Sequence, residues 1–276
     1  MFKIREPRAP ARAALITGAS RGIGAALAAA LPRPTSLLLA GRDGVALEQV
    51  AGSQRSTGRR VEIVTADLAT AEGRSSVAKA AAAFEIDLLI ANAGKGDYGA
   101  FLDIGRAAHR DTIDVNITAA VELIHALTPG MVARARLSGQ RAGLMTIAST
   151  AAFVPVPRFA MYAASKAFLL SFTEALTAEL AGDPIDVLCV CPGATRTAFG
   201  KRAGWQGGDV PGAMRAETVA AAALSALGVR RTLVIDPLPA PVLVPIALAR
   251  ALCATALHVG GSAATSGTGP VKRRAE

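Results

Sequence analysis

The stretch Thr17-Gly-Ala-Ser-Arg-Gly-Ile-Gly24 decides the fold. It follows a short apolar run and precedes an alanine-rich run with helical spacing, so it predicts a tight turn between a strand and a helix. In such a turn, the backbone N–H groups and the positive end of the helix dipole can hold a pyrophosphate. Gly18, Gly22 and Gly24 are the positions expected to let phosphates approach. Taken alone, the spacing also describes an ordinary structural turn.

Seven short β-branched or leucine-rich runs alternate with longer helical segments along the chain. This order is typical of a parallel sheet with crossover helices on both faces. The sequence therefore predicts an α/β fold, a Rossmann-like doubly wound parallel seven-stranded sheet. Residues 1–236 are expected to form this single domain, and residues 237–276 a C-terminal extension that packs on the core or a partner and is flexible at its end. The expected strands are 13–17, 36–40, 61–66, 86–91, 143–149, 186–191 and 232–236, and the expected helices are 22–31, 44–51, 70–84, 111–135, 160–181 and 216–228.

Residues suited to ligand binding stand directly after six of the predicted strands. In a doubly wound sheet, ligands bind in the crevice beyond the carboxyl ends of the strands. Their joint placement favours a nucleotide site over a chance turn. The six residues are Gly18, Arg42, Asp67, Asn92, Ser149 and Pro192.

Tyr162 and Lys166 lie four positions apart in a predicted helix. Positions i and i+4 project from one helix face, so the phenol and the ammonium are expected to share a pocket. A neighbouring cation favours the phenolate, which suits a tyrosine that acts as an acid and base near neutral pH. The structural alternative is a surface aromatic beside a solvated lysine.

Composition narrows the function classes. The net charge is +9 over 276 residues, but the chain has only two Tyr and one Trp, so a basic face with stacking aromatics for nucleic acid is not expected. Cys189, Cys191 and Cys253 form no evident pair, because the first two are expected to point to opposite faces of one strand. The lack of a disulfide pair fits a reducing compartment. The first residues contain no apolar run of the kind that a secretion signal requires, so secretion is not expected. We expect a cytoplasmic protein without a metal site.

The joint order of the motifs closely resembles the short-chain dehydrogenase/reductase family, and the resemblance runs from about residue 12 to residue 236. The motifs are Thr17-Gly-x-x-x-Gly-x-Gly24, Ala91-Asn-Ala-Gly94, Asn116, Ser149, Tyr162-x-x-x-Lys166 and Pro192-Gly193. The resemblance implies an oxidoreductase that acts on CH-OH groups with a nicotinamide cofactor.

The resemblance also implies catalytic roles. Tyr162 would give a proton to a carbonyl or take one from an alcohol, and Ser149 would bind the same oxygen. Lys166 would lower the pKa of Tyr162 and hold the nicotinamide ribose. Asn116 would keep a water beside Lys166 as part of a proton relay. These roles agree with the chemistry, because such a cofactor supplies the hydride and the protein must supply the proton.

The choice of cofactor follows from charge. An NAD enzyme of this fold places a carboxylate at the end of the second strand, where this chain has Gly41. Arg42 and Arg21 can instead bind a 2′-phosphate, so NADP(H) is expected in preference to NAD(H). Asp43 is interpreted as a helix cap. The remaining expected cofactor contacts are Gly18, Ser20, Gly22, Ile23, Gly24, Asp67, Leu68, Asn92, Gly94, Pro192, Gly193, Thr195 and Thr197, together with Tyr162 and Lys166.

The substrate and the partners are predicted only by class. Apolar residues near the site, among them Phe159 and Phe199, favour a small apolar carbonyl or alcohol. The Gly-rich stretch 198–213 with Trp205 suits a lid or an ordinary surface loop. The resemblance implies a homodimer or homotetramer formed through the helices 111–135 and 160–181. The extension, with its run 246–259, is expected to pack on protein, with peripheral membrane contact as the alternative.

Two other functions stay open. A non-catalytic NADP(H)-binding sensor or scaffold on the same fold would suit the basic tails. A sugar-nucleotide epimerase or dehydratase would share the Gly-rich turn, although its glycine spacing and the lack of a large C-terminal substrate domain argue against it.

Overall fold

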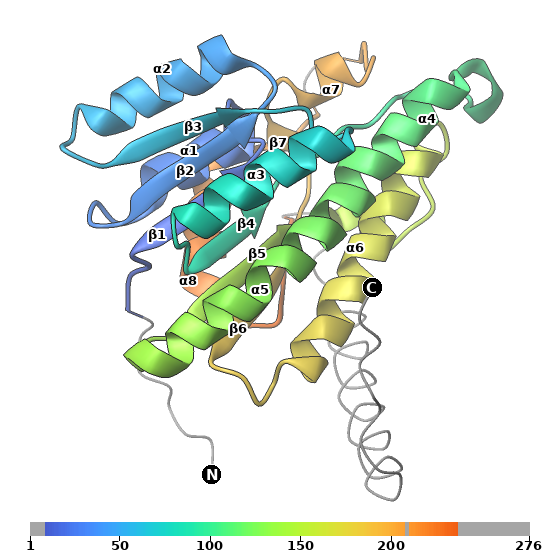
Figure 1. Ribbon diagram of the computed structural model, residues 1–276. Helices are drawn as coiled ribbons and strands as arrows, with labels where there is room; N and C mark the ends of the chain where they lie inside the picture. Colours follow the sequence, from blue (N-terminus) through green and yellow to red (C-terminus); the bar gives the residue numbers. More distant parts are fainter. Residues whose placement is uncertain (1–8, 208–209, 237–276) are drawn as a thin grey trace, which may run out of the picture.

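A computed structural model describes residues 9–207 and 210–236. Seven strands form one parallel sheet in the order β3-β2-β1-β4-β5-β6-β9 (Figure 1). The predicted fold class is thus confirmed. The strands are β1 (Ala13–Thr17), β2 (Ser36–Gly41), β3 (Val61–Thr65), β4 (Leu88–Ala91), β5 (Ala142–Ile147), β6 (Ile185–Pro192) and β9 (Thr232–Ile235). The extension from residue 237, including Cys253, lies outside the described residues.

Helices cover both faces of the sheet, because alternate strand residues point to opposite sides. Ala14 and Ile16 of β1 pack under α1 (Gly22–Ala30), α2 (Gly44–Arg55) and α8 (Ala216–Ala226). Ala13 and Leu15 pack under α3 (Ala71–Ala83), α5 (Ala119–Ser138) and α6 (Ala160–Glu179). Both layers are apolar on the side that meets the sheet, so the strands are buried on both faces, as a parallel sheet requires.

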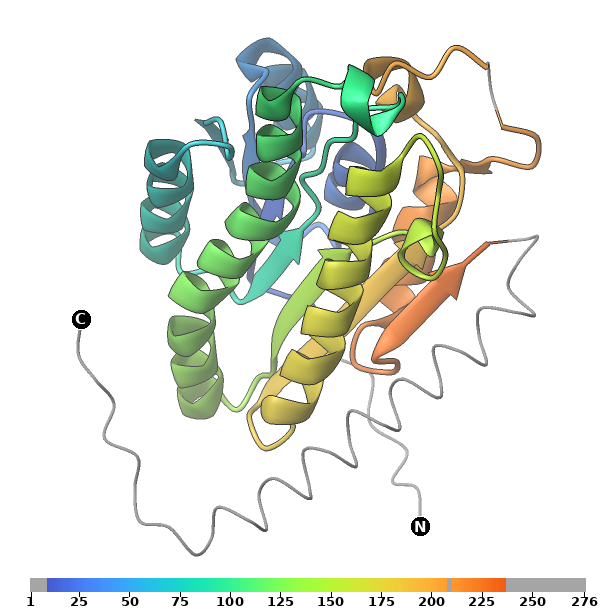
Figure 2. The same cartoon turned by 90° about the vertical axis from the view of Figure 1, so that its right-hand side faces the viewer.

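The predicted helix 111–135 is longer and less regular than expected. It begins with α4 (Arg106–Ile113), passes through a π-helical turn (Asp114–Thr118) and continues as α5. Figures 1 and 2 show α4 and α5 as one rod beside α6. The rod 106–138 is apolar and long enough to cross a membrane, yet half of its apolar window is buried inside the fold, as in the core helix of a globular domain.

The predicted strand 86–91 is shorter in the structure, because β4 begins at Leu88. Just before it, the Asp87 carboxylate accepts hydrogen bonds from the backbone N–H groups of Arg12 and Ala13 at 3.0 and 3.1 Å. The Asp87 N–H also donates to the Ala13 carbonyl oxygen at 3.0 Å, so Asp87 ties the start of β1 to the start of β4. The small parallel sheet of β7 (Thr195–Arg196) and β8 (Met214–Arg215) was not predicted.

The prediction that Cys189 and Cys191 face opposite sides of the sheet is wrong. Positions two apart in a strand share a face, and the two Sγ atoms lie 3.9 Å apart in a cluster with Ala148 and Leu170. Both thiols are free and buried. The hydrogen bond from Cys189, followed by burial, raises the pKa of the Cys191 thiol well above its ordinary value, which makes it a poor nucleophile.

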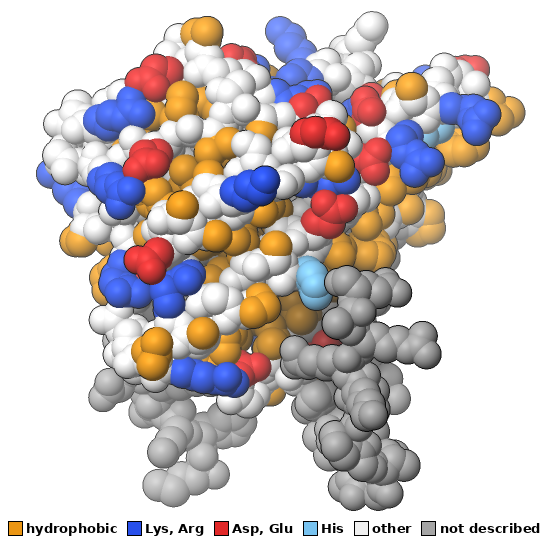
Figure 3. Space-filling model, viewed as in Figure 1, with side chains coloured by type: hydrophobic (Ala, Val, Ile, Leu, Met, Phe, Trp, Pro, Cys, Tyr) orange, Lys and Arg blue, Asp and Glu red, His pale blue; other side chains and the backbone are white. Residues whose placement is uncertain are grey.

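The charged surface is mixed. Over the face formed by α2, α3 and α5, Lys and Arg alternate with Asp and Glu and gather in no single basic patch (Figure 3). Several of the basic side chains have acidic partners, such as Arg74 with Glu122 at 2.6 Å. This face therefore lacks the basic stripe that nucleic-acid binding requires.

Candidate active site

The Gly-rich turn lies at the carboxyl end of β1, against the loop after β4. Gly18 has φ +65°, and a Cβ built there would lie 2.8 Å from the Ala93 Cα atom, so only glycine fits. A Cβ on Gly24 would lie 2.6 Å from the Asn92 Nδ2 atom. The turn therefore brings bare backbone to the start of α1.

The N-terminus of α1 is open to a ligand. No side-chain cap bonds to it among the described residues, so its first N–H groups point outward without a partner from a capping side chain. An anion at this position would complete those groups. The geometry fits the pyrophosphate of a dinucleotide. Ser20 and Ile23 are partly exposed beside it, and Ile23 also packs on the core.

Asn92 locks this turn to the neighbouring strand. Its Nδ2 donates to the Thr17 and Gly18 carbonyl oxygens at 2.8 and 3.2 Å. The Thr17 hydroxyl in turn accepts from the backbone N–H groups of Asn92 and Ala93, each at 3.0 Å. The side chain of Asn92 thus shapes the floor of the site from below.

Three guanidinium groups converge beside the turn. Arg21 forms an ion pair with Asp43, and Arg42 lies 3.9 Å from the Asp67 carboxylate. Arg202 comes from α7 (Phe199–Arg202), a helix above the carboxyl ends of the strands in Figure 1. Burial, and then repulsion from Arg21 and Arg42, lowers the pKa of Arg202. Sequence reasoning missed Arg202, although the basic pair at 201–202 follows the sixth strand.

Asp43 caps a helix on this side of the site, as expected, whereas Asp67 lies just before another helix cap. The Asp43 side chain accepts from the Ala46 N–H at 3.0 Å at the start of α2, which lowers its pKa. Asp67 accepts from the Ala69 N–H at 3.0 Å, while Thr70 caps α3. The Leu68 side chain is 4% exposed in the core, so only its backbone can face a cofactor.

Tyr162 and Lys166 occupy one face of α6, as predicted. The Lys166 Nζ lies 5.7 Å from the centroid of the Tyr162 ring and donates to the Ile147 carbonyl oxygen at 2.8 Å. Ser149, directly after β5, bonds to the Tyr162 hydroxyl through its side chain and accepts from the Ala151 N–H at 3.1 Å. The three polar groups meet at the carboxyl ends of β5 and β6.

The pKa values correct one expectation. Burial raises the pKa of Tyr162, and the hydrogen bond from Ser149 opposes that rise. Burial lowers the pKa of Lys166 to about 8. The expected lowering of the Tyr162 pKa by Lys166 is not found here, because desolvation of the buried phenol dominates.

Asn116 lies in the π-helical turn and is 1% exposed. Its Oδ1 accepts from the Lys95 N–H and its Nδ2 donates to the Lys95 carbonyl, both at 2.8 Å, while Nδ2 also donates to the Ser165 hydroxyl at 2.8 Å. A Cβ built on Gly94 would lie 3.5 Å from Asn116 Oδ1 and 3.3 Å from Lys166 Nζ. The bare Gly94 backbone therefore lies between the two side chains.

The segment after β6 lies over the Gly-rich turn. A Cβ built on Gly22 would lie 3.1 Å from the Thr197 methyl carbon. Thr195 donates to the Gly193 carbonyl at 3.0 Å, and Thr197 accepts from the Phe199 N–H at 3.2 Å, so both hydroxyls stabilise the loop itself. Pro192 ends β6. The segment can thus cover a ligand held by the turn.

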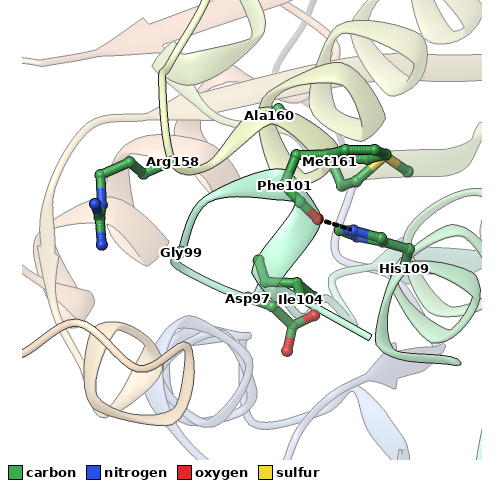
Figure 4. A pocket seen from close by; sticks show the side chains of 8 residues that line it. All are labelled: Asp97, Gly99, Phe101, Ile104, His109, Arg158, Ala160 and Met161. Atoms are coloured by element: carbon green, nitrogen blue, oxygen red, sulfur yellow. Dashed lines mark hydrogen bonds between the residues drawn. The ribbon is translucent and has the colours of Figure 1, made fainter. Parts of the chain in front are cut away.

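A separate small pocket lies between the loop after β4 and the start of α6 (Figure 4). His109 points across it, and its Nε2 lies 3.1 Å from the Phe101 carbonyl oxygen. None of the predicted catalytic residues lines this pocket. Its lining residues are Asp97, Gly99, Phe101, Ile104, His109, Arg158, Ala160 and Met161.

Together, the doubly wound sheet, the open Gly-rich turn and the Tyr–Lys pair define the class of nicotinamide-dependent oxidoreductases. The comparison with protein families narrows the class. The chain belongs to the short-chain dehydrogenase family, whose pattern matches residues 12–206.

Three similar proteins illustrate the membership. The 1-deoxy-11-beta-hydroxypentalenate dehydrogenase of Streptomyces exfoliatus is 36% identical over 191 residues, which are 67% of this chain and 68% of that protein. A short-chain dehydrogenase from Sphingobium yanoikuyae in complex with NADPH is 30% identical with a TM-score of 0.74, over 97% of this chain and 99% of that one. A short-chain dehydrogenase/reductase from Burkholderia phymatum in complex with NAD is 25% identical with a TM-score of 0.74, over 87% and 93%.

Proposed function

We propose that this protein is an NADP(H)-dependent oxidoreductase that interconverts a ketone or aldehyde and an alcohol on a largely apolar substrate. The observation that carries the proposal is the meeting of Ser149, Tyr162 and Lys166 at the strand ends that also hold the Gly-rich turn. A sensor or scaffold is not favoured, because it has no need of this buried polar group.

The residues would act on one oxygen atom. The Tyr162 hydroxyl, bonded to Ser149, would donate its proton to the carbonyl oxygen of the substrate or accept one from the alcohol. A nicotinamide bound along the Gly-rich turn would supply or accept the hydride. Lys166, which is 4% exposed, would hold the ribose with its ammonium.

The preference for NADP(H) is argued from charge. Arg21, Arg42 and Arg202 face the place where a 2′-phosphate would lie after β2. β2 itself ends in Gly41, so no carboxylate stands at that position, and the nearby Asp43 and Asp67 pair with Arg21 and Arg42. The similar proteins bind either cofactor: the Sphingobium yanoikuyae enzyme binds NADPH and the Burkholderia phymatum enzyme binds NAD. The three arginines support NADP(H) in this proposal.

The oligomeric state and the location of the protein are also part of the proposal. We expect a homodimer or homotetramer in the cytoplasm, with residues 237–276 on the core, on a partner or at a membrane surface. Size-exclusion chromatography with light scattering, on the full chain and on a chain ended at residue 236, tests the assembly. Sedimentation with anionic vesicles tests the membrane contact.

Tyr162→Phe tests the proposed chemistry. The variant should lose nearly all turnover of ketones with NADPH, because the proton donor is gone, while NADPH binding stays measurable by fluorescence. Ser171→Ala, an exposed hydroxyl on the same helix, is the matched control and should keep full activity. Turnover of the Tyr162 variant at the unmodified rate would refute the proposal.

A further inference from the structure

Five aromatic rings gather over the candidate active site. The Tyr162 ring lies 4.6 Å from Phe159 and 5.1 Å from Phe199, measured between ring centroids. Tyr98 continues the group, 5.8 Å from Phe159 and 4.8 Å from Trp205, with both contacts edge to face. The rings come from three regions of the chain: Tyr98 from the loop after β4, Phe159 and Tyr162 from the start of α6, and Phe199 and Trp205 from α7 and the loop after it. We call this group the aromatic cup.

This concentration is unusual for the chain. Only 4% of its residues are aromatic, and it has two Tyr and one Trp. Both tyrosines and the single tryptophan lie in the aromatic cup. Rings in such pairs gain free energy beyond the burial of their area, provided that they adopt stacked or edge-to-face geometry. An alanine-rich chain that places its scarce rings here favours a ligand that uses them.

Backbone hydrogen bonds hold the three regions together. The Tyr98 N–H donates to the Ala203 carbonyl at 2.6 Å, which joins the loop after β4 to the end of α7. The Gly99 N–H donates to the Arg158 carbonyl at 2.8 Å, which joins the same loop to the segment before α6. The segments that carry the aromatic cup are therefore fixed to one another by backbone hydrogen bonds.

The Phe159 and Tyr162 rings rest on the backbone, whereas Phe199 stands farther from Phe159. A Cβ built on Gly96 would lie 2.9 Å from a Phe159 ring carbon and 3.0 Å from a Tyr162 ring carbon, so the bare Gly96 backbone supports both rings from below. Phe199 stands farther away, 6.2 Å from Phe159 between centroids. A flat group that reaches the Tyr162 hydroxyl would take the place of the Phe199 ring and stack on Phe159.

Two cations beside the cup, Lys95 and Arg158, already have contacts of their own. The Lys95 ammonium lies 3.4 Å from Asp97 and 3.5 Å from Asp111. The Arg158 guanidinium lies over the Tyr98 ring, 5.3 Å from its centroid, as a cation–π contact. The wall that faces Tyr162 thus presents ring faces and edges and offers no free charge from these groups for an ionic substrate.

We propose that the carbonyl of the substrate is attached to a planar aromatic ring, which stacks on Phe159 between Tyr162 and Trp205. The substrate class is therefore aryl ketones and their benzylic alcohols, and Phe159, Phe199 and Trp205 determine it. This inference rests on the proposed reaction at Tyr162 and adds to it the recognition of the ring.

The test compares two alcohols that differ only in the ring, 1-phenylethanol and 1-cyclohexylethanol. The Tyr162→Phe protein, loaded with NADP⁺, binds without reacting, and the emission of Trp205, the chain's one tryptophan, reports binding. The phenyl compound should bind about five-fold to ten-fold more tightly, as expected for one or two aromatic pairs. A merely apolar site would bind the more hydrophobic cyclohexyl compound at least as tightly, and that result would overturn the inference.

Substitutions test whether the preference for an aromatic ring arises in the aromatic cup. With NADPH, Phe159→Leu should lower the ratio of kcat/KM for acetophenone to that for cyclohexyl methyl ketone by about five-fold. Phe168→Leu, on the exposed side of α6, should leave the ratio unchanged. An unchanged ratio in the Phe159 variant would sink the inference and leave the proposed reaction standing. Absence of turnover for every ketone would instead refute the proposed reaction. The comparison of 1-phenylethanol with 1-cyclohexylethanol in binding would still show whether the site prefers an aromatic ring.

Discussion

The Lys166 ammonium donates to the Ile147 carbonyl oxygen over 2.8 Å, at the end of β5. This bond holds the side chain of Lys166 straight along the floor of the site, where its charge is buried. The same burial places its pKa at about 8, well below the ordinary 10.5 of lysine. Lys166 therefore changes its charge within the range in which enzymes are assayed.

We expect NADPH affinity and kcat/KM for ketone reduction to fall as the pH rises through about 8. Below this pH the folded, free protein carries the ammonium that would hold the ribose, and above it the amine is neutral. Binding of an anionic cofactor favours the ammonium, so kcat should decline at a higher pH than kcat/KM. Fluorescence titration with NADPH from pH 6.5 to 10 measures the effect. Lys166→Met should bind weakly with no break near pH 8, and an equally sharp break in that variant would contradict the assignment.

Gly24→Ala should destabilise the turn and impair cofactor binding. The added methyl would meet the Asn92 side chain at 2.6 Å, and overpacking of this kind costs about 1–3 kcal/mol. Chemical denaturation measures the stability, and fluorescence titration measures NADPH affinity. Gly52→Ala is the matched control, since nothing lies within 4 Å of a Cβ there and the helix α2 should gain about 0.5–1 kcal/mol. Equal effects of the two substitutions would disprove the close approach.

Arg202→Ala should weaken NADPH binding by about ten-fold and change NADH binding little, because a charge-assisted bond to a phosphate contributes about 1.5–3 kcal/mol. Arg42→Ala should act in the same direction. Arg215, which is exposed and paired with Glu217 at 3.3 Å, provides the control substitution to Ala. Dissociation constants for both cofactors settle the point, and parallel losses for NADPH and NADH would remove the 2′-phosphate role from Arg202.

Asn116→Ala should cost about 1–3 kcal/mol of stability, because it leaves the partly buried backbone N–H and C=O groups of Lys95 without their partners. If Asn116 also serves the proton relay, kcat should fall more than NADPH affinity does. Thermal unfolding and steady-state kinetics separate the two effects. A loss of stability with kcat unchanged would leave Asn116 a purely structural residue.

Local patterns predicted the frame of the site well. The strand before Thr17, the turn to Gly24 and the i, i+4 pair Tyr162 and Lys166 are each encoded within a few residues, so spacing alone places them. The strand-end residues followed from the rule that ligands bind beyond the carboxyl ends of parallel strands.

The features that sequence reasoning missed depend on contacts between distant segments. Arg202 reaches Arg21 and Arg42 only because α7 folds back over the Gly-rich turn. The aromatic cup joins Tyr98 to Trp205 across more than a hundred residues, and no periodicity announces that contact. Desolvation of Tyr162 and Lys166 likewise depends on what covers them, so the spacing gave the pair but not the direction of the Tyr162 pKa.

The π-helical turn at Asp114–Thr118 has a mechanical consequence for the rod it interrupts. It contains one residue more than an α-helical turn would, and each residue of an α-helix advances the side-chain direction by about 100°. A single deletion within the turn would thus restore a regular helix while swivelling α4 against α5. The Asn116 amide would then lose its hydrogen bonds to the Lys95 backbone, or the apolar face of α5 would turn away from the sheet. The extra residue therefore sets the rotation between α4 and α5 so that both contacts can form.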